Sequence, residues 1–174
     1  WESDFSAVGL VEKFRMMSQW FHVAILDLTT TKDFQPKTAW IAKRLDISQL
    51  EARDAVERLL KLGFLVSQNG PLKKPTEKMY FTTGKSETAI RQFHKQMIEL
   101  ASRQLDNADP QAFAAREISS ITMSVRRDRI EEAKKRISEF QKELATYLTE
   151  GEGEEVYQLN LQLFPLTKEQ KESL

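Results

Sequence analysis

The sequence predicts an α+β fold that is mostly helical, with a winged helix-turn-helix followed by helices and a strand–helix–strand module. Three observations lead to this prediction. Residues 38–82 carry, in order, the signals of two helices joined by a short turn and of a two-stranded wing. Apolar residues recur at helical spacing over three further stretches. Over two short stretches in the last third of the chain, they alternate instead with polar residues, which is the strand period.

Composition limits the class of protein. The 174 residues include 26 Lys or Arg, 26 Asp or Glu and no Cys. This balance of charge argues against a nonspecific nucleic-acid coat protein, and the lack of cysteine excludes disulfides and thiolate metal sites. The apolar run over residues 20–26 is far too short for a membrane span, and no secretory signal is visible. We therefore expect a cytoplasmic protein with no membrane partner.

The first part of the chain, residues 1–84, is predicted to hold a long helix and the winged helix-turn-helix. Over residues 5–28, apolar side chains recur every three or four positions, which indicates an amphipathic helix. The first helix of the motif covers residues 38–45. Its Ile41 and Leu45 lie one turn apart on the same face, where they are expected to meet the core.

The second helix of the motif has the clearest boundaries. Ser48 followed three residues later by Glu51 forms a capping box, in which each residue satisfies a backbone N–H of the other. The helix is expected to run to Leu62, with Gly63 as its stop. In the turn before it, Asp46 tolerates a left-handed conformation better than most residues. The side chains predicted to face the core are those of Leu50, Ala55, Leu59 and Leu62.

The outer face of this second helix is the candidate DNA reader. Arginine and lysine supply phosphate anchors and donors to guanine edges. The candidate DNA-binding residues on this helix are Gln49, Arg53, Arg58 and Lys61. Acidic residues on the same helix cancel this charge. The alternative is therefore a solvated face held by ion pairs such as Asp54–Arg58 and Glu57–Lys61.

The predicted wing is the better candidate for phosphate contacts. Residues 64–66 and 79–81 read as its two short strands, around a loop that contains glycine and proline. The loop and its flank carry Lys73, Lys74 and Lys78 against a single glutamate. Basic loop tips also occur merely as soluble surface, and that alternative stays open.

The second part, residues 85–174, is predicted to combine a helical segment with a strand–helix–strand module for dimerisation or sensing. The expected elements are helices over 86–105, 111–117 and 130–147, and strands over 120–125 and 157–163. Two strands alone make a poor sheet, and a second subunit is a natural source of more strands. We therefore expect a homodimer.

Three arginines, Arg126, Arg127 and Arg129, cluster where the first of these strands meets the helix. Beside the free N–H groups of a helix N-terminus, they would suit an effector that carries phosphate, of a kind the sequence does not specify. The alternative is a charged strand end, with Asp128 as the N-cap of the helix.

No pattern in the sequence indicates catalysis, a metal site or a cofactor. His22 and His94 are the only histidines, and neither has the spacing of metal ligands. Each is interpreted as a hydrogen-bonded packing residue. Neither a nucleophile elbow nor a Walker or dinucleotide-binding glycine motif occurs. We therefore expect a non-enzymatic protein without a cofactor.

Several segments together carry a resemblance that covers essentially the whole chain. They are QWFHVAI at 19–25, WIAKRL at 40–45, ERLLKLG at 57–63, REISS at 116–120 and VYQLNLQLFPLT at 156–167. In this combination and order, the chain resembles a paralogous family of bacterial transcriptional regulators. The chain departs from the family at Asp46, where a glycine is common in the turn. The resemblance implies no catalytic or ligand residues.

Members of that family carry a further helix-turn-helix of the phage-repressor kind at their N-terminus. The chain starts at Trp1, within what reads as regular sequence. The resemblance therefore implies that this chain is a C-terminal part, preceded by the principal DNA reader. We expect a regulatory protein that dimerises and that binds DNA, weakly on its own, or controls DNA binding. The alternative is an interaction module whose winged helix contacts protein instead of DNA.

Overall fold

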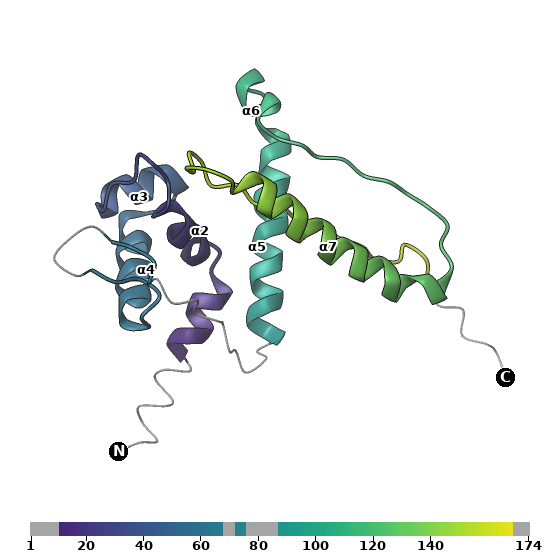
Figure 1. The fold of residues 1–174 in the computed structure, drawn as a ribbon, viewed down its shortest axis with the longest axis horizontal. Coiled ribbons are helices and arrows are strands. Elements are labelled where there is room, and N and C mark those ends of the chain that lie inside the picture. Colours follow the sequence, from purple (N-terminus) through teal and green to yellow (C-terminus); the bar gives the residue numbers. More distant parts are fainter. Residues whose placement is uncertain (1–10, 68–71, 76–86, 169–174) are drawn as a thin grey trace, which may run out of the picture.

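The computed structural model describes residues 11–67, 72–75 and 87–168, and helices dominate this part of the chain (Figure 1). A helical stretch over residues 11–18 comes first. The elements that follow are α2 (Phe21–Leu28), α3 (Thr38–Leu45), α4 (Gln49–Lys61), α5 (Glu87–Asp106), α6 (Pro110–Ala114), the 3-10 turn η1 (Arg127–Arg129) and α7 (Ile130–Leu148). Helices α2, α3 and α4 pack together, α5 stands beside them, and α7 projects away from the group (Figure 1).

The N-terminal helix is interrupted, so the prediction of one continuous helix over residues 5–28 is wrong in its described part. The chain leaves the helix at Gln19 and Trp20, and α2 begins at the next residue. Gln96 of α5 occupies the break. Its Oε1 accepts from the backbone N–H of Trp20 at 3.2 Å, and its Nε2 donates to the carbonyl of Ser18 at 2.8 Å. This side chain replaces hydrogen bonds that a continuous helix would have made within itself.

The two helices and the turn of the motif form where the sequence places them. Asp46, after α3, adopts the left-handed conformation with φ 51°, and its N–H donates to the carbonyl of Ala42. The predicted capping box of α4 is confirmed, because Ser48 Oγ accepts from the N–H of Glu51 and the Glu51 carboxylate accepts from the N–H of Ser48. Gly63 follows α4 with φ 78°, as expected of a helix stop.

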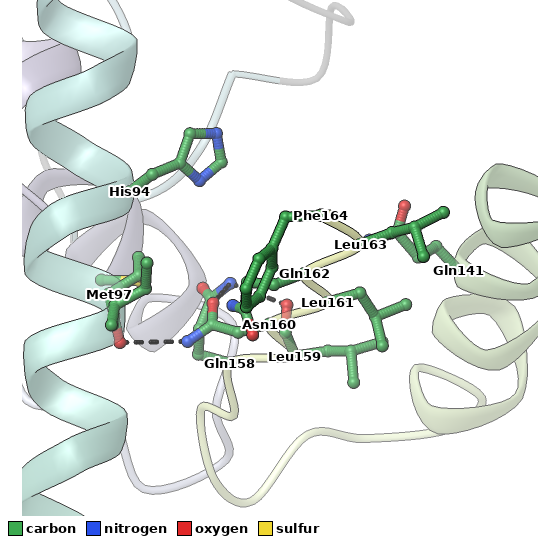
Figure 2. A pocket seen from close by; sticks show the side chains of 11 residues that line it. His94, Met97, Gln141, Gln158, Leu159, Asn160, Leu161, Gln162, Leu163 and Phe164 are labelled. Carbon is green, nitrogen blue, oxygen red and sulfur yellow. Dashed lines mark hydrogen bonds between the residues drawn. The ribbon is translucent and has the colours of Figure 1, made fainter. Parts of the chain in front are cut away.

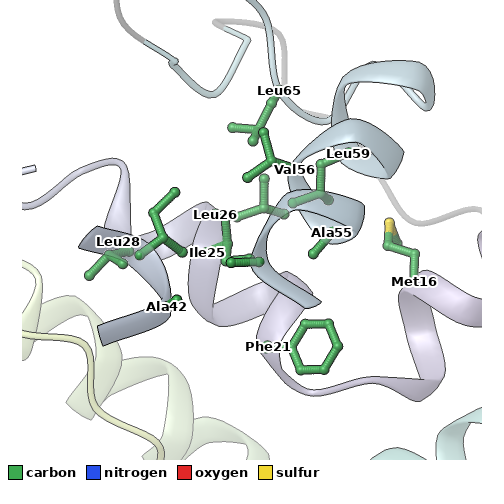
Figure 3. Close-up of a cluster of buried hydrophobic side chains, with 12 residues drawn as sticks. Met16, Phe21, Ile25, Leu26, Leu28, Ala42, Ala55, Val56, Leu59 and Leu65 are labelled. Atoms are coloured by element: carbon green, nitrogen blue, oxygen red, sulfur yellow. The ribbon is translucent and has the colours of Figure 1, made fainter. Parts of the chain in front are cut away.

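The hydrophobic core lies among these N-terminal helices (Figure 3). The residues of α4 that contribute to it are Ala52, Ala55, Val56 and Leu59. Leu50 was predicted to face the core, but it is 57% exposed. The reason is the phase of the helix: Leu50 lies two residues before Ala52, which places it on nearly the opposite side of the cylinder.

The winged helix is not part of the fold, because the described residues contain no strand. After α4, Val66 and Lys73 form one isolated antiparallel bridge, with backbone hydrogen bonds of 3.0 and 3.1 Å. The apolar run at 64–66 serves packing instead, since Leu65 is fully buried in the helical core. The second predicted wing strand, 79–81, lies outside the described residues.

The strand–helix–strand module is also wrong, although its helix is confirmed as α7. Residues 120–125 and 157–163 are not strands in the structure, where neither joins a ladder. An alternating sequence sets the period of the side chains, whereas a strand also needs a paired neighbour to accept its backbone hydrogen bonds. Of the other two helices predicted here, α5 is confirmed. The short helix begins at Pro110, after an Asp109 N-cap, and is briefer than expected.

The C-terminal segment returns to the helical group at two places. After α7, the chain meets the connector between α2 and α3, where Lys32 N–H donates to the carbonyl of Gly153 at 2.9 Å. Further on, Nδ2 of Asn160 donates to the carbonyl of Met97 on α5 at 3.0 Å. Between these contacts Val156 packs against the core. These contacts hold the extended C-terminal segment against the N-terminal helices and α5.

Replacing Ser48 with alanine should lower the free energy of unfolding by about 1 kcal/mol, because the backbone N–H of Glu51 in the first turn of α4 loses its acceptor. Urea unfolding followed by circular dichroism would measure the change. Ser138→Ala, on the exposed surface of α7, is the matched control and should not be destabilising. An equal loss in both variants would show that the capping box contributes nothing specific.

Candidate functional site

A continuous stripe of polar side chains runs along the outer face of α4. Gln49, Arg53, Glu57 and Lys61 follow one another at steps of four residues, and all four are exposed. Steps of four keep side chains on one face of a helix. Arg53 has a contact of 3.6 Å with Asp54, but its side chain is 59% exposed, so the guanidinium group stays accessible. Of the four residues predicted to read DNA from this helix, three therefore lie on this stripe.

Arg58, the fourth, lies elsewhere. Its side chain is only 15% exposed and turns toward the N-terminal helices. Nε donates to Oε2 of Glu12 at 2.6 Å, and Nη1 lies 3.0 Å from Nε2 of His22. The structure therefore places Arg58 in an internal ion pair, where it is not presented to a nucleic acid. Asp54, its expected surface partner, contacts Arg53 instead.

His22 completes this internal cluster. The imidazole is fully buried, and Nδ1 lies 3.2 Å from the carbonyl of Gln19. Since a carbonyl only accepts, Nδ1 carries the proton, and Nε2 is left to accept from Arg58. Burial lowers the pKa of His22 to about 4, while the hydrogen bond from Arg58 lowers the pKa of the Glu12 carboxyl. The interpretation of His22 as a hydrogen-bonded packing residue is confirmed. His94, by contrast, is exposed and lies edge-on to Phe93.

The three lysines assigned to the wing differ in their surroundings and in whether the structure describes them. Lys73, whose backbone forms the bridge after α4, has an exposed side chain. Nζ of Lys74 lies 2.5 Å from Oδ1 of Asp27 on α2, so part of its charge is already neutralised. Lys78 lies outside the described residues. Of the two described lysines, Lys73 is therefore the better placed to meet a phosphate.

The acidic loop at residues 152–155 contacts two basic residues beside the helix-turn-helix, and the sequence alone did not predict this contact. Arg44, at the end of α3, binds Glu155 through both terminal nitrogens, at 2.9 and 3.4 Å. Its guanidinium group also lies 5.5 Å from the ring centroid of Trp40. Lys32 binds the neighbouring Glu154. Residues 150–155 include four glutamates, but the basic partners of Glu154 and Glu155 lie more than 100 positions away along the chain.

The three arginines before α7 do not converge on a common point. Arg126 binds Asp128 through Nε at 3.1 Å and Nη2 at 2.7 Å. Asp128 is therefore not the N-cap of α7; Arg129 holds that position and makes no capping bond with its side chain. Arg127 and Arg129 are exposed. The arrangement of the three arginines agrees better with the alternative, a charged end of the segment before α7, than with a preformed site for an anion.

A groove of about 500 Å³ lies between α5, α7 and residues 158–164 (Figure 2). Amide and apolar side chains line it, together with His94. Gln158 Nε2 donates to Oδ1 of Asn160 at 3.2 Å, and the bond of Asn160 to α5 closes one side. None of the lining residues is Lys, Arg, Asp or Glu. Its chemistry therefore suits apolar contact better than a phosphate-bearing effector.

Two observations concern other classes of site. Across the described ranges, no three His, Asp or Glu side chains gather closely enough to hold a metal ion. In the same part of the chain, none of the helices combines the length and apolar character needed to cross a bilayer.

Comparison with known proteins gives a family but no activity. The chain matches the model of DUF4423, a domain of unknown function, over residues 5–166. The chain belongs to this family. Searches of curated proteins and of solved structures find no match. Because the DUF4423 match includes α2 to α7, the helix-turn-helix, the acidic loop and the projecting α7 all lie within one family domain.

The stability of this domain should fall as the pH is lowered from about 6.5 to about 4. In this range an unfolded chain protonates His22 while the folded chain does not, so folding loses about 3 kcal/mol across it. Glu12 adds to the loss below its ordinary pKa of 4.5, because its folded pKa is lowered. Urea unfolding at a series of pH values, followed by tryptophan fluorescence, measures the profile.

His22→Gln should flatten this profile between pH 4 and 6.5, since glutamine does not titrate. The matched control, His94→Gln, removes an exposed histidine and should leave the slope unchanged. If the two variants gave the same profile, the buried imidazole would not be the group responsible.

Proposed function

We propose that this DUF4423 domain is a non-enzymatic regulatory module that binds DNA through the outer face of α4. The observation that carries the proposal is the pair Gln49 and Arg53, exposed one turn apart in the first half of the second helix of a helix-turn-helix. In proteins with this motif, the N-terminal part of that helix meets the base edges in the major groove. Glutamine pairs with adenine and arginine with guanine, both through two hydrogen bonds.

Two exposed lysines could contact phosphates of a duplex that is read by Gln49 and Arg53. Lys61 ends the stripe on α4, and Lys73, in the bridge that follows this helix, is exposed. Charges that anchor the duplex near the reading residues set its register without adding sequence preference. Such a protein would act where the chromosome is, which in a bacterium is the cytoplasm.

Binding by one copy of this chain is expected to be weak and dependent on salt. Glu57 sits within the stripe, and Glu51 and Asp54 lie on the same helix, so the local net charge is small. With few phosphates neutralised, few counterions are released, and affinity stays low. A preceding DNA reader, as the resemblance to transcriptional regulators implies, would make this domain an auxiliary contact.

A specific observation favours the alternative function, an interaction module that contacts protein. Leu50 is more than half exposed at the start of α4, next to the proposed reading residues. An exposed leucine flanked by Glu51 is an ordinary component of a protein interface, and DNA binding led by hydrogen bonds and charge does not require it. Substitutions separate the two functions, because protein docking would depend on Leu50 and DNA binding on Arg53.

Arg53→Ala should weaken binding to a mixed-sequence DNA duplex about tenfold at low salt, since a contact of this kind is worth ~1–3 kcal/mol. Fluorescence anisotropy with a labelled duplex pool measures the affinity. Arg103→Ala, an exposed arginine on α5, removes the same charge elsewhere and should have little effect. The proposal is wrong if the unmodified chain fails to bind duplex, or if both variants bind equally.

Removing charge from the acidic loop should strengthen DNA binding. In Glu154→Gln with Glu155→Gln, Lys32 and Arg44 lose their carboxylate partners, and repulsion between the loop and the phosphates disappears. The same duplex assay should show tighter binding than the unmodified chain. The control, Glu131→Gln with Glu132→Gln at the start of α7, changes the net charge equally and should raise affinity less. Equal effects would mean that only net charge matters.

A further inference from the structure

Helix α7 carries an apolar stripe that the chain itself covers only in part. The helix has 19 residues, and none of them is buried. Phe140 is 49% exposed and Tyr147 is 73% exposed. A lone helix of this length, about 28 Å, is only marginally stable in water, because most helical stability in proteins comes from packing an apolar face. A covering partner would therefore stabilise α7.

The spacing of the stripe indicates what kind of partner covers it. Apart from Ala145 and Leu148 near its C-terminal end, the apolar residues of α7 are Ile130, Ala133, Ile137, Phe140, Leu144 and Tyr147. The steps between them alternate strictly between three and four residues, which is the heptad pattern of a helix that packs against another helix. An amphipathic helix lying on a globular core shows a broader stripe with additional apolar neighbours. We propose that α7 pairs in antiparallel orientation with α7 of a second copy of this chain.

Charge beside the stripe supports a second copy and fixes the orientation. Arg136 and Glu143 occupy equivalent heptad positions flanking the apolar seam, one heptad apart. In an antiparallel pair with Ile137 packed on Phe140 of the partner subunit, Arg136 meets Glu143 of the partner subunit. Twofold symmetry makes this contact twice. A parallel pair would bring Arg129 beside Lys134 of the partner subunit, where like charges repel.

The neighbouring C-terminal segment enlarges the surface. Leu161, Leu163 and Phe164 are all more than 40% exposed, and they border the same groove as Gln141 of α7 (Figure 2). A stable interface buries roughly 1,200 Å² or more in total, which is more than a single pair of short helices readily supplies. The apolar segment beside α7 provides the additional area. A symmetric pair covers the stripe and this segment in both copies.

The test uses the 174-residue chain in analytical ultracentrifugation without DNA, so its outcome is independent of the proposed DNA binding. The unmodified chain should sediment as a dimer at high micromolar concentration. Arg136→Glu should weaken self-association about tenfold at low ionic strength, because it creates two repulsive contacts. Glu143→Arg should do the same. Lys142→Glu is the control: it makes the same charge change on the far side of α7 and should leave the dimer intact.

Mixing gives the decisive result. Arg136→Glu and Glu143→Arg chains each repel themselves, but an antiparallel mixed pair brings glutamate to arginine at both contacts. Equimolar mixing should therefore restore the dimer. All of these residues favour helix, so circular dichroism should show folded variants. A monomeric unmodified chain would overturn the proposal, because no second copy would then cover α7. A dimer insensitive to both substitutions, or a mixture that stays monomeric, would overturn the antiparallel pairing.

Discussion

Arg58 carries a full charge into a half-buried position, and the arrangement of the N-terminal helices follows from the need to satisfy it. A guanidinium group taken out of water needs both an opposite charge and acceptors for its N–H groups. Glu12 supplies the first from the helical stretch before α2, and His22 supplies a neutral acceptor from α2 itself. The contacts of Arg58 with Glu12 and His22 fix how α4 is rotated about its own axis. Gln49 and Arg53 therefore lie on the opposite, solvent-facing side of the helix. The proposed DNA-binding face is thus positioned by an internal electrostatic requirement.

The correct sequence predictions are those that depend on contacts a few residues apart. The capping box at Ser48, the left-handed turn at Asp46 and the helix stop at Gly63 are determined by local backbone geometry, which the sequence shows directly. The strands failed for the complementary reason. Residues 120–125 and 157–163 have the right alternation, but pairing needs a neighbour that alternation does not specify. The side chain of Gln96, which fills the break before α2, shows equally that a distant residue decides where a helix ends.

For the candidate site, the sequence predicted the helix but not which charged residues form ion pairs within the chain. Arg58 lies one turn after Asp54, which predicts a surface ion pair. Glu12, 46 positions away, binds it instead, at 2.6 Å. In the same way, Arg44 is paired with Glu155 and Lys74 with Asp27 across long stretches of chain. Such pairs cannot be read from spacing, because they depend on tertiary packing that brings remote segments together.

These internal ion pairs connect the proposed DNA-binding face of α4 with the proposed pairing through α7. Arg58, Arg44 and Lys74 are already paired within the chain, which leaves Gln49, Arg53, Lys61 and Lys73 as the exposed set around α4. One copy with so few contacts would hold DNA weakly. Joining two copies through α7 makes the second contact intramolecular, so overall affinity rises without any new contact at either face. Because α7 projects away from the helix-turn-helix, pairing through it leaves α4 uncovered (Figure 1). Weak DNA binding through α4 and pairing through α7 are therefore compatible within the proposed regulatory module.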